Sequence, residues 1–389
     1  MTLLLTGATG FVGIELLARE LRDPARRVLV LIRAAGDEDA RRRLHETLLS
    51  AFGAVEPHAQ RVTAVAGDLE RPGLGIDPAL AREITEIVHA AASVSFELSL
   101  ERSRAINVEG TRRMLELAVR CPSLRRFTYV STAYVAGEHR GVFGEQDFDV
   151  GQRFRNPYEQ SKFEAERLVR SYAGRLPLTI VRPSIVVGDR HSGWTPSFNV
   201  LYWPLRALAR GAYPILPARR SAPVDVVSVD YVADAICALH ALPQAAGGTF
   251  HLTASAAASS IGELLDLAVK RLQCRRPPLV SPALYRRVAH PLALRCVGVR
   301  RRRFLRATET YLPYFAMRVR YDDAGTRATL GRAIAPAPLP EYFDRLVDYA
   351  LLARWGARAL GRARALDVVA PRCRAAEAAA ADLLQRAAA

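Results

Sequence analysis

A short apolar strand that runs directly into three regularly spaced glycines constrains this fold more than any other feature of the chain. Residues 2–6 read TLLLT, and Gly7, Gly10 and Gly13 follow before a helical pattern of apolar residues begins. Glycines at such a junction permit a tight turn and let the backbone approach a pyrophosphate, which the free amides of the helix start stabilise. A second apolar strand at 28–32 follows within about thirty residues, as a dinucleotide-binding βαβ unit requires.

The alternation of strands and helices continues along the chain. Further apolar strands are expected at 62–66, 84–89, 126–130, 178–181 and 249–252. This rhythm is typical of a parallel sheet with helices on both faces, which binds ligands at the carboxyl ends of its strands. We therefore predict an α/β fold, a Rossmann-like doubly wound parallel sheet with a smaller, mainly helical C-terminal substrate lobe.

The expected domain boundaries lie where the rhythm changes. Residues 1–182 are predicted to form an NADP-binding Rossmann domain, to which the chain returns at about 223–252. Residues 183–222 and 253–389 are predicted to form the substrate-binding lobe.

Net charge and cysteine usage limit the class of protein. The chain has 55 Lys and Arg against 39 Asp and Glu, a formal net charge of +16. Such a field attracts phosphates, acidic carrier proteins or anionic membrane surfaces, although a compositional drift toward arginine explains it equally well. Five scattered cysteines without a Cys-x-x-Cys fit free thiols in a reducing cytoplasm, and no metal site is expected. No apolar run reaches the roughly 18 residues that span a bilayer, so we expect a cytoplasmic protein with at most peripheral membrane contact.

One segment is more basic than this drift explains. Between Lys270 and Arg306 there are twelve Lys or Arg and no Asp or Glu. The block is a candidate receptor for the phosphates of coenzyme A, an acidic acyl carrier protein or an anionic membrane surface, and a solvated basic face is the alternative. No nucleic-acid recognition motif accompanies the charge, so nucleic acid is not an expected partner.

Residues at the predicted strand ends are expected to contact a dinucleotide. Arg33 ends the second strand about 20 residues after the last glycine, where the adenosine ribose normally lies. Because a guanidinium matches a 2′-phosphate, we predict NADPH as the cofactor, with Arg43 as a weaker second contact. The other expected cofactor contacts, at the glycine turn, the strand ends and the following helix, are Gly7, Thr9, Gly10, Phe11, Val12, Gly13, Asp68, Leu69, Ala90, Ala91, Asn107 and Ser131.

The stretch 156–162, NPYEQSK, contains one of only two lysines in the chain. Tyr158 and Lys162 are four residues apart and would share one face of a helix. Since a lysine can be desolvated and can tune the acidity of a neighbour, the pair is a candidate for proton transfer. An incidental lysine on a surface helix is the alternative. Ser131 and Thr132 end the fifth strand and would present hydroxyls to the ligand crevice, although such residues also form turns and helix caps.

Aromatic residues gather just after the sixth strand. Trp194, Phe198 and Tyr202 follow it closely and are the best candidates for an acyl pocket, although aromatic residues at this spacing more often belong to a core. Ser93 is a further expected substrate contact.

The motifs together resemble a known family. TGATGFVG resembles the glycine turn of extended short-chain dehydrogenases/reductases. VLIRA, GDL, HAAASVSFELSL, INVEGT, FTYVSTAYVAG, NPYEQSK, VRPSIVVGD and VDVVSVDYVADAI follow in the order found in fatty acyl-CoA reductases and thioester reductase domains, the male-sterility-type NAD-binding family. The resemblance covers about the first 255 residues and thins out after them.

This resemblance implies a catalytic triad and a reaction. It selects Thr132 over Ser131 as partner of Tyr158 and Lys162, and it lays Pro183, Ser184 and Ile185 along the nicotinamide. The implied activity is NADPH-dependent reduction of an acyl thioester, borne by CoA or an acyl carrier protein, to an aldehyde or onward to an alcohol. Tyr158 would donate a proton, and Lys162 would lower the pKa of that phenol and bind the nicotinamide ribose.

Two other interpretations stay open at the level of sequence. One is an extended-type reductase or dehydrogenase acting on a ketone or hydroxyl of a lipid, steroid or sugar nucleotide. The other is a non-catalytic NADP-binding regulator.

Overall fold

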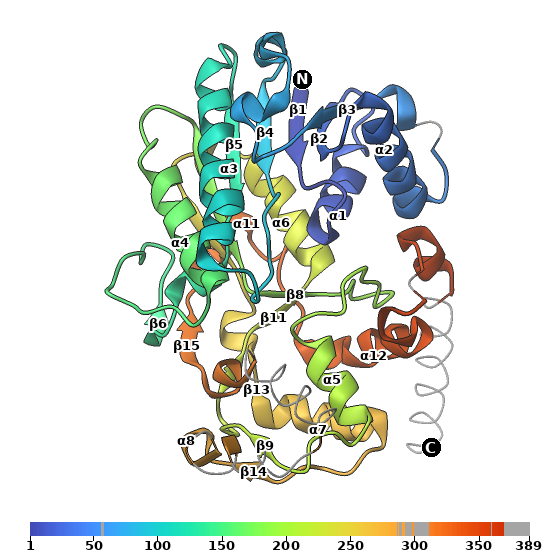
Figure 1. The fold of residues 1–389 in the computed structure, drawn as a ribbon, viewed down its shortest axis with the longest axis vertical. Coiled ribbons are helices and arrows are strands. Elements are labelled where there is room, and N and C mark those ends of the chain that lie inside the picture. The colour runs from blue at the N-terminus through green and yellow to red at the C-terminus, as the bar shows by residue number, and fades with distance from the viewer. Residues whose placement is uncertain are drawn as a thin grey trace.

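A seven-stranded parallel sheet forms the upper half of the protein in Figure 1. The computed structural model describes residues 1–55, 58–285, 287, 290–291, 298, 311–358 and 360–368. Every neighbouring pair in the sheet is parallel. In spatial order the strands are β3 (Val62–Gly67), β2 (Arg27–Arg33), β1 (Thr2–Thr6), β4 (Glu86–His89), β5 (Arg126–Val130), β7 (Leu178–Pro183) and β12 (Thr249–Leu252).

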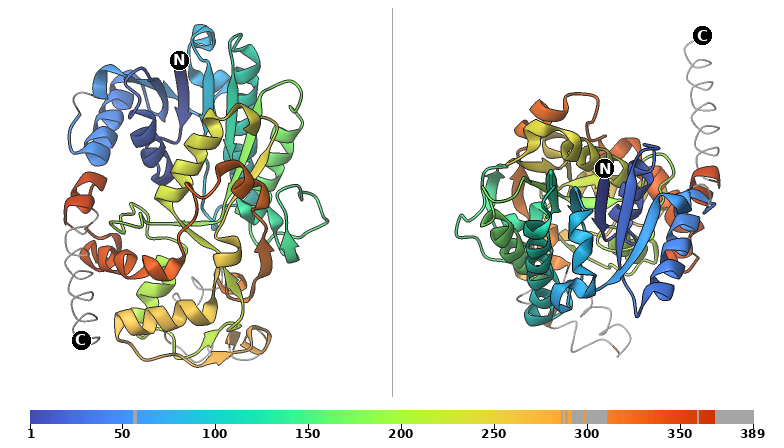
Figure 2. Two further views of the ribbon diagram at one scale, coloured as in Figure 1. Left: turned by 180° about the vertical axis from the view of Figure 1, so that it is seen from behind. Right: turned by 90° about the horizontal axis from the view of Figure 1, so that it is seen from above.

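Alternating apolar side chains explain why both faces of this sheet are covered. Leu3 and Leu5 of β1 pack on one face, whereas Leu4 between them packs on the other. Figure 2 shows the helices on both sides of the sheet. One face is covered by α1 (Phe11–Glu20), α2 (Asp37–Phe52) and α6 (Val229–Ala241), and the other by α3 (Leu100–Arg120) and α4 (Pro157–Arg170).

The strand order reverses between β1 and β4. The chain leaves β1 toward β2 on one side, and it leaves β4 toward β5 on the other. Such a reversal opens a crevice at the carboxyl ends of the two strands, where doubly wound sheets bind their ligands. The predicted doubly wound parallel sheet is therefore confirmed, and all seven strands lie within two residues of their expected bounds.

The remaining elements form a smaller, mainly helical part below the sheet in Figure 1. A second hydrophobic core joins its three longest helices. These are α5 (Tyr202–Ala209), α7 (Ile261–Leu272) and α12 (Phe343–Leu352), with the short α8 (Pro282–Leu284) in the same part. The short α11 (Ala324–Leu330) packs instead against β12 and α6. The strand pairs are β8 (Ile185–Val187) with β11 (Val226–Ser228), β9 (Leu216–Pro217) with β14 (Leu279–Val280), and β10 (Pro223–Val224) with β13 (Ser259–Ser260).

One strand pair joins distant parts of the chain and was not expected from the sequence. The strands β6 (Arg140–Phe143) and β15 (Arg318–Tyr321) are parallel neighbours. Their pairing fixes the segment that follows β5 against the carboxyl-terminal part, near the end of α4 that bears Tyr158 (Figure 1).

The described ranges contain no helix long and apolar enough to cross a bilayer. Within the same ranges, no cluster of three or more His, Cys, Asp or Glu could hold a metal ion. The basic block extends from Lys270 to Arg306, and most of its residues from 286 to 306 lie outside the described ranges.

Candidate functional site

The glycine turn after β1 brings two backbone segments into close contact. Gly7 adopts φ +78°, and the Gly10 amide donates to its carbonyl over 2.8 Å. A Cβ on Gly7 would lie 2.8 Å from the Ala91 nitrogen and 2.9 Å from the Ala90 carbonyl carbon, so only glycine fits. At Gly13 a Cβ would overlap the Gly7 carbonyl, so helix α1 can approach the turn only without a side chain there.

The start of α1 fits a bound pyrophosphate. Gly10 is its N-cap and is exposed, as is Thr9, and no side chain in the described part of the chain caps the helix. Its first amides are therefore available to an anion. Phe11 and Val12 begin the helix, and the Phe11 ring packs edge-on against Trp194 at 5.9 Å. A nicotinamide dinucleotide fits this turn because the exposed helix start leaves its first backbone amides free of a side-chain cap.

Two arginines meet at the end of β2. Arg33 is exposed and pairs in register with Gly67 of β3. The Arg43 guanidinium on α2 donates to the Arg33 carbonyl. The structure thus brings together the two residues predicted to bind a 2′-phosphate.

The turn after β3 is held by hydrogen bonds of its own. Asp68 accepts from the Glu70 amide at 3.0 Å, and Arg113 of α3 donates to the Leu69 carbonyl at 2.7 Å. This fixes the segment predicted to border the adenine.

Asn107 ties the loop after β4 to helix α4. Its side-chain oxygen accepts from the Ser93 amide at 2.8 Å, and its nitrogen donates to the Ser93 carbonyl at 3.1 Å and to Ser161 Oγ at 3.0 Å. Asn107 is buried, and its amide is occupied by these bonds. These bonds position the loop after β4 beside α4, and the contact of Asn107 with a cofactor stays a prediction.

Thr132 and Tyr158 meet at the carboxyl end of β5. Thr132 Oγ1 accepts from the Tyr134 amide at 3.2 Å and lies 3.4 Å from the Pro183 carbonyl. Asn156 caps α4 by accepting from the Glu159 amide at 3.0 Å, which places Tyr158 in the first helical turn. Burial raises the pKa of Tyr158 to about 12, and a hydrogen bond with Thr132 opposes that rise. The phenol is therefore protonated at neutral pH and able to donate.

Lys162 lies in the second turn of α4 and is fully enclosed. Its ammonium donates to Tyr129 Oη and to the Val130 carbonyl, each at 2.8 Å. Burial lowers the pKa of Lys162 to about 7, while the Glu166 carboxylate raises it. We expected Lys162 to lower the pKa of Tyr158, but the pKa of Tyr158 responds here to burial, Thr132 and Glu159.

A buried ion pair lies next to Lys162 on α4. Ser131 Oγ donates to Glu166 Oε2 at 2.6 Å, and Arg182 Nη2 lies 2.7 Å from Glu166 Oε1. Both charged side chains are inaccessible to solvent. The Ser131 hydroxyl thus belongs to this network, and its predicted contact with a cofactor stays a prediction. Sequence reasoning missed Glu166, although it lies four residues after Lys162 and so shares a helix face with it.

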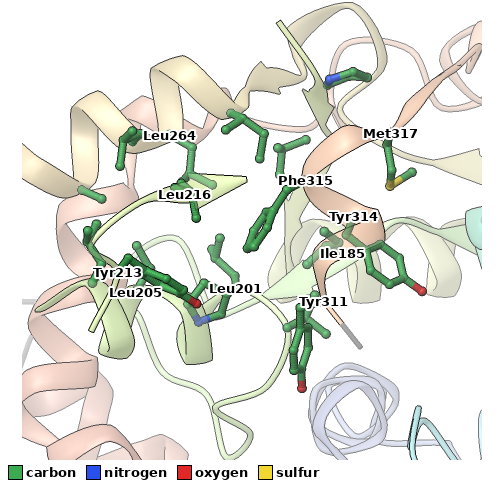
Figure 3. A pocket seen from close by; sticks show the side chains of 18 of the residues that line it. Ile185, Leu201, Leu205, Tyr213, Leu216, Leu264, Tyr311, Tyr314, Phe315 and Met317 are labelled. Atoms are coloured by element: carbon green, nitrogen blue, oxygen red, sulfur yellow. The ribbon is translucent and has the colours of Figure 1, made fainter. Parts of the chain in front are cut away.

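The segment between β7 and β8 connects the region of Thr132 with a cavity. The Ser184 side chain interacts with Asp225, whose burial raises its pKa to about 6. The next residue, Ile185, lines an apolar cavity of about 820 Å³, its open mouth included. Figure 3 shows Leu201, Leu205, Tyr213, Leu216, Leu264, Tyr311, Tyr314, Phe315 and Met317 around the same space.

Aromatic side chains connect the wall of the cavity with Tyr158. Phe96 stacks on Tyr314 with ring centroids 5.4 Å apart, and it lies 5.6 Å from the Tyr158 ring. Tyr314 and Tyr134 both line the cavity. Tyr314 and Phe96 thus connect the wall of the cavity with the ring of Tyr158.

The aromatic residues expected to form the pocket lie beside it instead. Trp194 is fully buried and donates from Nε1 to the Leu360 carbonyl at 3.1 Å. The Tyr202 hydroxyl accepts from the Gly188 amide at 3.0 Å, and the Phe198 ring stacks on another tyrosine of the core. None of the three is among the described residues that line the cavity. We therefore transfer the prediction of an acyl pocket to the residues shown in Figure 3.

The comparisons with known proteins agree with this geometry. A family model described as male sterility protein matches residues 5–236, which is more than half of the chain. The chain belongs to this family. An isonitrile lipopeptide synthase from Streptomyces coeruleorubidus is 38% identical over 211 residues, which cover 52% of this chain and 14% of that protein. Another, from Mycobacterium tuberculosis (strain ATCC 25618 / H37Rv), is 33% identical over 275 residues, which cover 62% of this chain and 11% of that protein. The chain thus matches only a small part of these relatives.

Solved structures extend the likeness to the whole fold. The terminal R domain from the myxalamid PKS-NRPS biosynthetic pathway has a TM-score of 0.77 and 27% identity, with 91% of each chain covered. The reductase (R) domain of a nonribosomal peptide synthetase from Mycobacterium tuberculosis has a TM-score of 0.63 and 25% identity, over 90% of this chain and 92% of that one. Membership of the family and the structural likeness identify the protein as an NAD(P)-dependent oxidoreductase of the extended short-chain type.

Replacing the buried lysine by methionine should change how stability depends on pH. The pKa of Lys162 is about 7 in the folded protein against a usual 10.5, so the unfolded chain binds more protons between these values. The wild type should therefore gain about 2 kcal/mol relative to Lys162→Met between pH 7 and pH 9. Chemical denaturation of the cofactor-free proteins measures this difference.

Lys270→Met is the matched control, because Lys270 is the only other lysine and is exposed on α7. Its stability relative to wild type should change by less than about 0.5 kcal/mol over the same range. A pH-independent difference for Lys162→Met would show that the ammonium is not desolvated as described.

Proposed function

We propose that this chain reduces an acyl thioester to an aldehyde, using NADPH. The observation that carries the proposal is that the hydroxyls of Thr132 and Tyr158 lie together at a strand end, beside an apolar cavity. The two hydroxyls can bind a carbonyl oxygen while the cavity holds the acyl chain. The names of the relatives, which are peptide synthetases and their reductase domains, support a substrate held as a thioester.

The site favours reduction because its donors lie where negative charge develops. The bound cofactor supplies a hydride to the carbonyl carbon. Thr132 and Tyr158 donate hydrogen bonds to the carbonyl oxygen as it gains charge, and such preplaced donors are each worth about 10²–10³ in rate. Tyr158 then gives its proton to that oxygen, which forms a hemithioacetal. Breakage of the carbon–sulfur bond releases the aldehyde and the free thiol.

Lys162 lies one helical turn after Tyr158 on α4 and supports this chemistry. Its ammonium is fixed at the end of β5 by Tyr129 and the Val130 carbonyl. We propose that it binds the nicotinamide ribose and that it donates a proton to Tyr158 after the phenol has given up its own. A pKa near 7 suits a group that must both hold and release a proton at neutral pH.

The fold supports separate binding roles for its two parts. We propose that residues 1–182, with about 223–252, bind the cofactor, and that 183–222 and 253–389 bind the substrate. The glycine turn and Arg33 belong to the first set, and most residues that line the cavity belong to the second. The carrier is CoA or a carrier protein, and reduction stops at the aldehyde or continues to the alcohol with a second NADPH.

Removing the phenolic hydroxyl should abolish turnover without loss of the fold. In Tyr158→Phe, kcat for NADPH oxidation with an octanoyl thioester should fall by about 10²–10³, because one donor and the proton are lost. NADPH affinity, measured by fluorescence titration, should stay within about twofold. Tyr172→Phe, a change in a tyrosine just after the same helix, should keep full activity. An active Tyr158→Phe enzyme would exclude the proposed mechanism.

Cofactor choice depends on the arginine at the end of β2. Arg33→Ser should lower kcat/KM for NADPH by about 10- to 100-fold, since a charge-assisted bond to a phosphate is worth about 1.5–3 kcal/mol. The value for NADH should change by less than about threefold, because NADH has no 2′-phosphate. Arg41→Ser, on the exposed surface of α2, is the control. Equal losses with both cofactors would contradict a role for Arg33 in phosphate binding.

A further inference from the structure

A second, polar cleft lies beside the apolar cavity. It has a volume of about 1130 Å³, its solvent-filled opening included, and it shares Met317 with the cavity. Five arginines from separate segments of the chain line it: Arg140 in β6, Arg153 and Arg155 before α4, Arg219 after β9, and Arg318 in β15.

Most of this positive charge is not neutralised by the protein. Arg153 lies 3.4 Å from Glu138, and Arg155 lies 3.1 Å from the buried Glu159. No acidic side chain in the described ranges lies within 4.0 Å of the three others, which are Arg140, Arg219 and Arg318. All three are exposed, so the cleft presents free guanidinium groups.

Two of these arginines face each other across a strand pair. Arg318 of β15 is directly opposite Arg140 of β6 in the parallel register. Like charges opposite each other destabilise a sheet. An arginine-rich composition explains neither this pairing nor the convergence of three distant segments on one cleft. A bound anion would relieve the repulsion, and forked guanidinium donors match phosphate oxygens in particular.

The position of the cleft connects it with the reaction. Arg155 directly precedes Asn156, the cap of α4, and is three residues before Tyr158. Met317 separates the cleft from the cavity proposed to hold the acyl chain. A substrate with an apolar end in the cavity and an anionic end in the cleft would therefore pass Met317, on the side of the protein where Arg155 leads into α4.

We propose that this arginine cleft binds the phosphate of the phosphopantetheine arm that carries the acyl thioester. The inference rests on the proposed thioester reduction and adds the site that recognises the carrier. Coenzyme A and carrier proteins both present this arm, so the cleft serves either source through the same phosphate. The apolar cavity then selects the acyl group, and the cleft selects its carrier.

The test compares three thioesters with the double variant Arg140→Gln/Arg318→Gln. The substrates are octanoyl-CoA, S-octanoyl-4′-phosphopantetheine and S-octanoyl-pantetheine, which lacks the phosphate. In the double variant, KM for the two phosphorylated substrates should rise at least tenfold, while KM for octanoyl-pantetheine and for NADPH stays within twofold. Arg320→Gln, on the same strand but not in the cleft lining, should leave all KM values within twofold.

Three outcomes would overturn the proposal. The first is an equal rise in KM for octanoyl-pantetheine, which would indicate a general structural effect. The second is no rise for any substrate. The third is a rise for octanoyl-CoA alone, which would assign the cleft to the nucleotide phosphates of CoA and not to the arm.

A binding measurement separates this proposal from the proposed activity. Calorimetric titration with CoA and with 4′-phosphopantetheine, without NADPH, should show at least tenfold weaker binding of both to the double variant and unchanged binding to Arg320→Gln. If the wild type reduced none of the thioesters, the proposed function would fail, yet this titration would still decide whether the cleft binds the arm. Equal binding by the wild type and the double variant would overturn the proposed role of the arginine cleft.

Discussion

The desolvated ammonium of Lys162 is the constraint on which the rest of the site depends. A buried charge costs several kcal/mol unless hydrogen bonds and an opposite charge compensate it. Tyr129 and the Val130 carbonyl supply the hydrogen bonds, and Glu166, one turn further along α4, supplies the charge. Helix α4 is thereby fixed against the end of β5, so the first helical turn brings Tyr158 to Thr132.

Burial, together with the same charge, keeps a neighbouring histidine neutral. His89 lies within the sheet, and burial together with Lys162 lowers its pKa to about 3. The neutral ring hydrogen-bonds to Thr6 and Thr111, and Thr6 in turn accepts from the Ala91 amide beside the glycine turn. Tyr129 hydrogen-bonds to both Lys162 and Thr111, so α4 and the glycine turn are parts of one continuous set of buried polar contacts.

Much of this architecture could be predicted from the sequence, because it depends on local patterns. Apolar runs defined the seven strands, glycine spacing defined the turn, and the four-residue interval placed Tyr158 and Lys162 on one helix face. The cavity could not be predicted in this way. Its walls join α5 and α7 to residues 311–317, and nothing in residue type distinguishes a lining tyrosine such as Tyr314 from a core residue such as Tyr202.

The arginine cleft could not be predicted from the sequence for the same reason. Arg140 and Arg318 become neighbours only through the pairing of two short strands that lie far apart in the sequence. The sequence offered the basic block after Lys270 as a receptor for CoA phosphates, an acidic carrier protein or an anionic membrane, and most of its residues from 286 to 306 lie outside the described ranges. The structure gathers other arginines into a cleft beside α4. The site therefore combines a crevice at the strand ends, built on local motifs, with an apolar cavity and an arginine cleft built on long-range contacts.

Transfer of a labelled hydride tests the central claim most directly. The protein should be incubated with NADPH deuterated at the transferred position of the nicotinamide and with octanoyl-4′-phosphopantetheine, and the products identified by mass. Hydride transfer to the thioester carbon predicts octanal with one deuterium on its carbonyl carbon, together with free phosphopantetheine thiol. Unlabelled products, or release of octanoic acid in place of the aldehyde, would contradict the account.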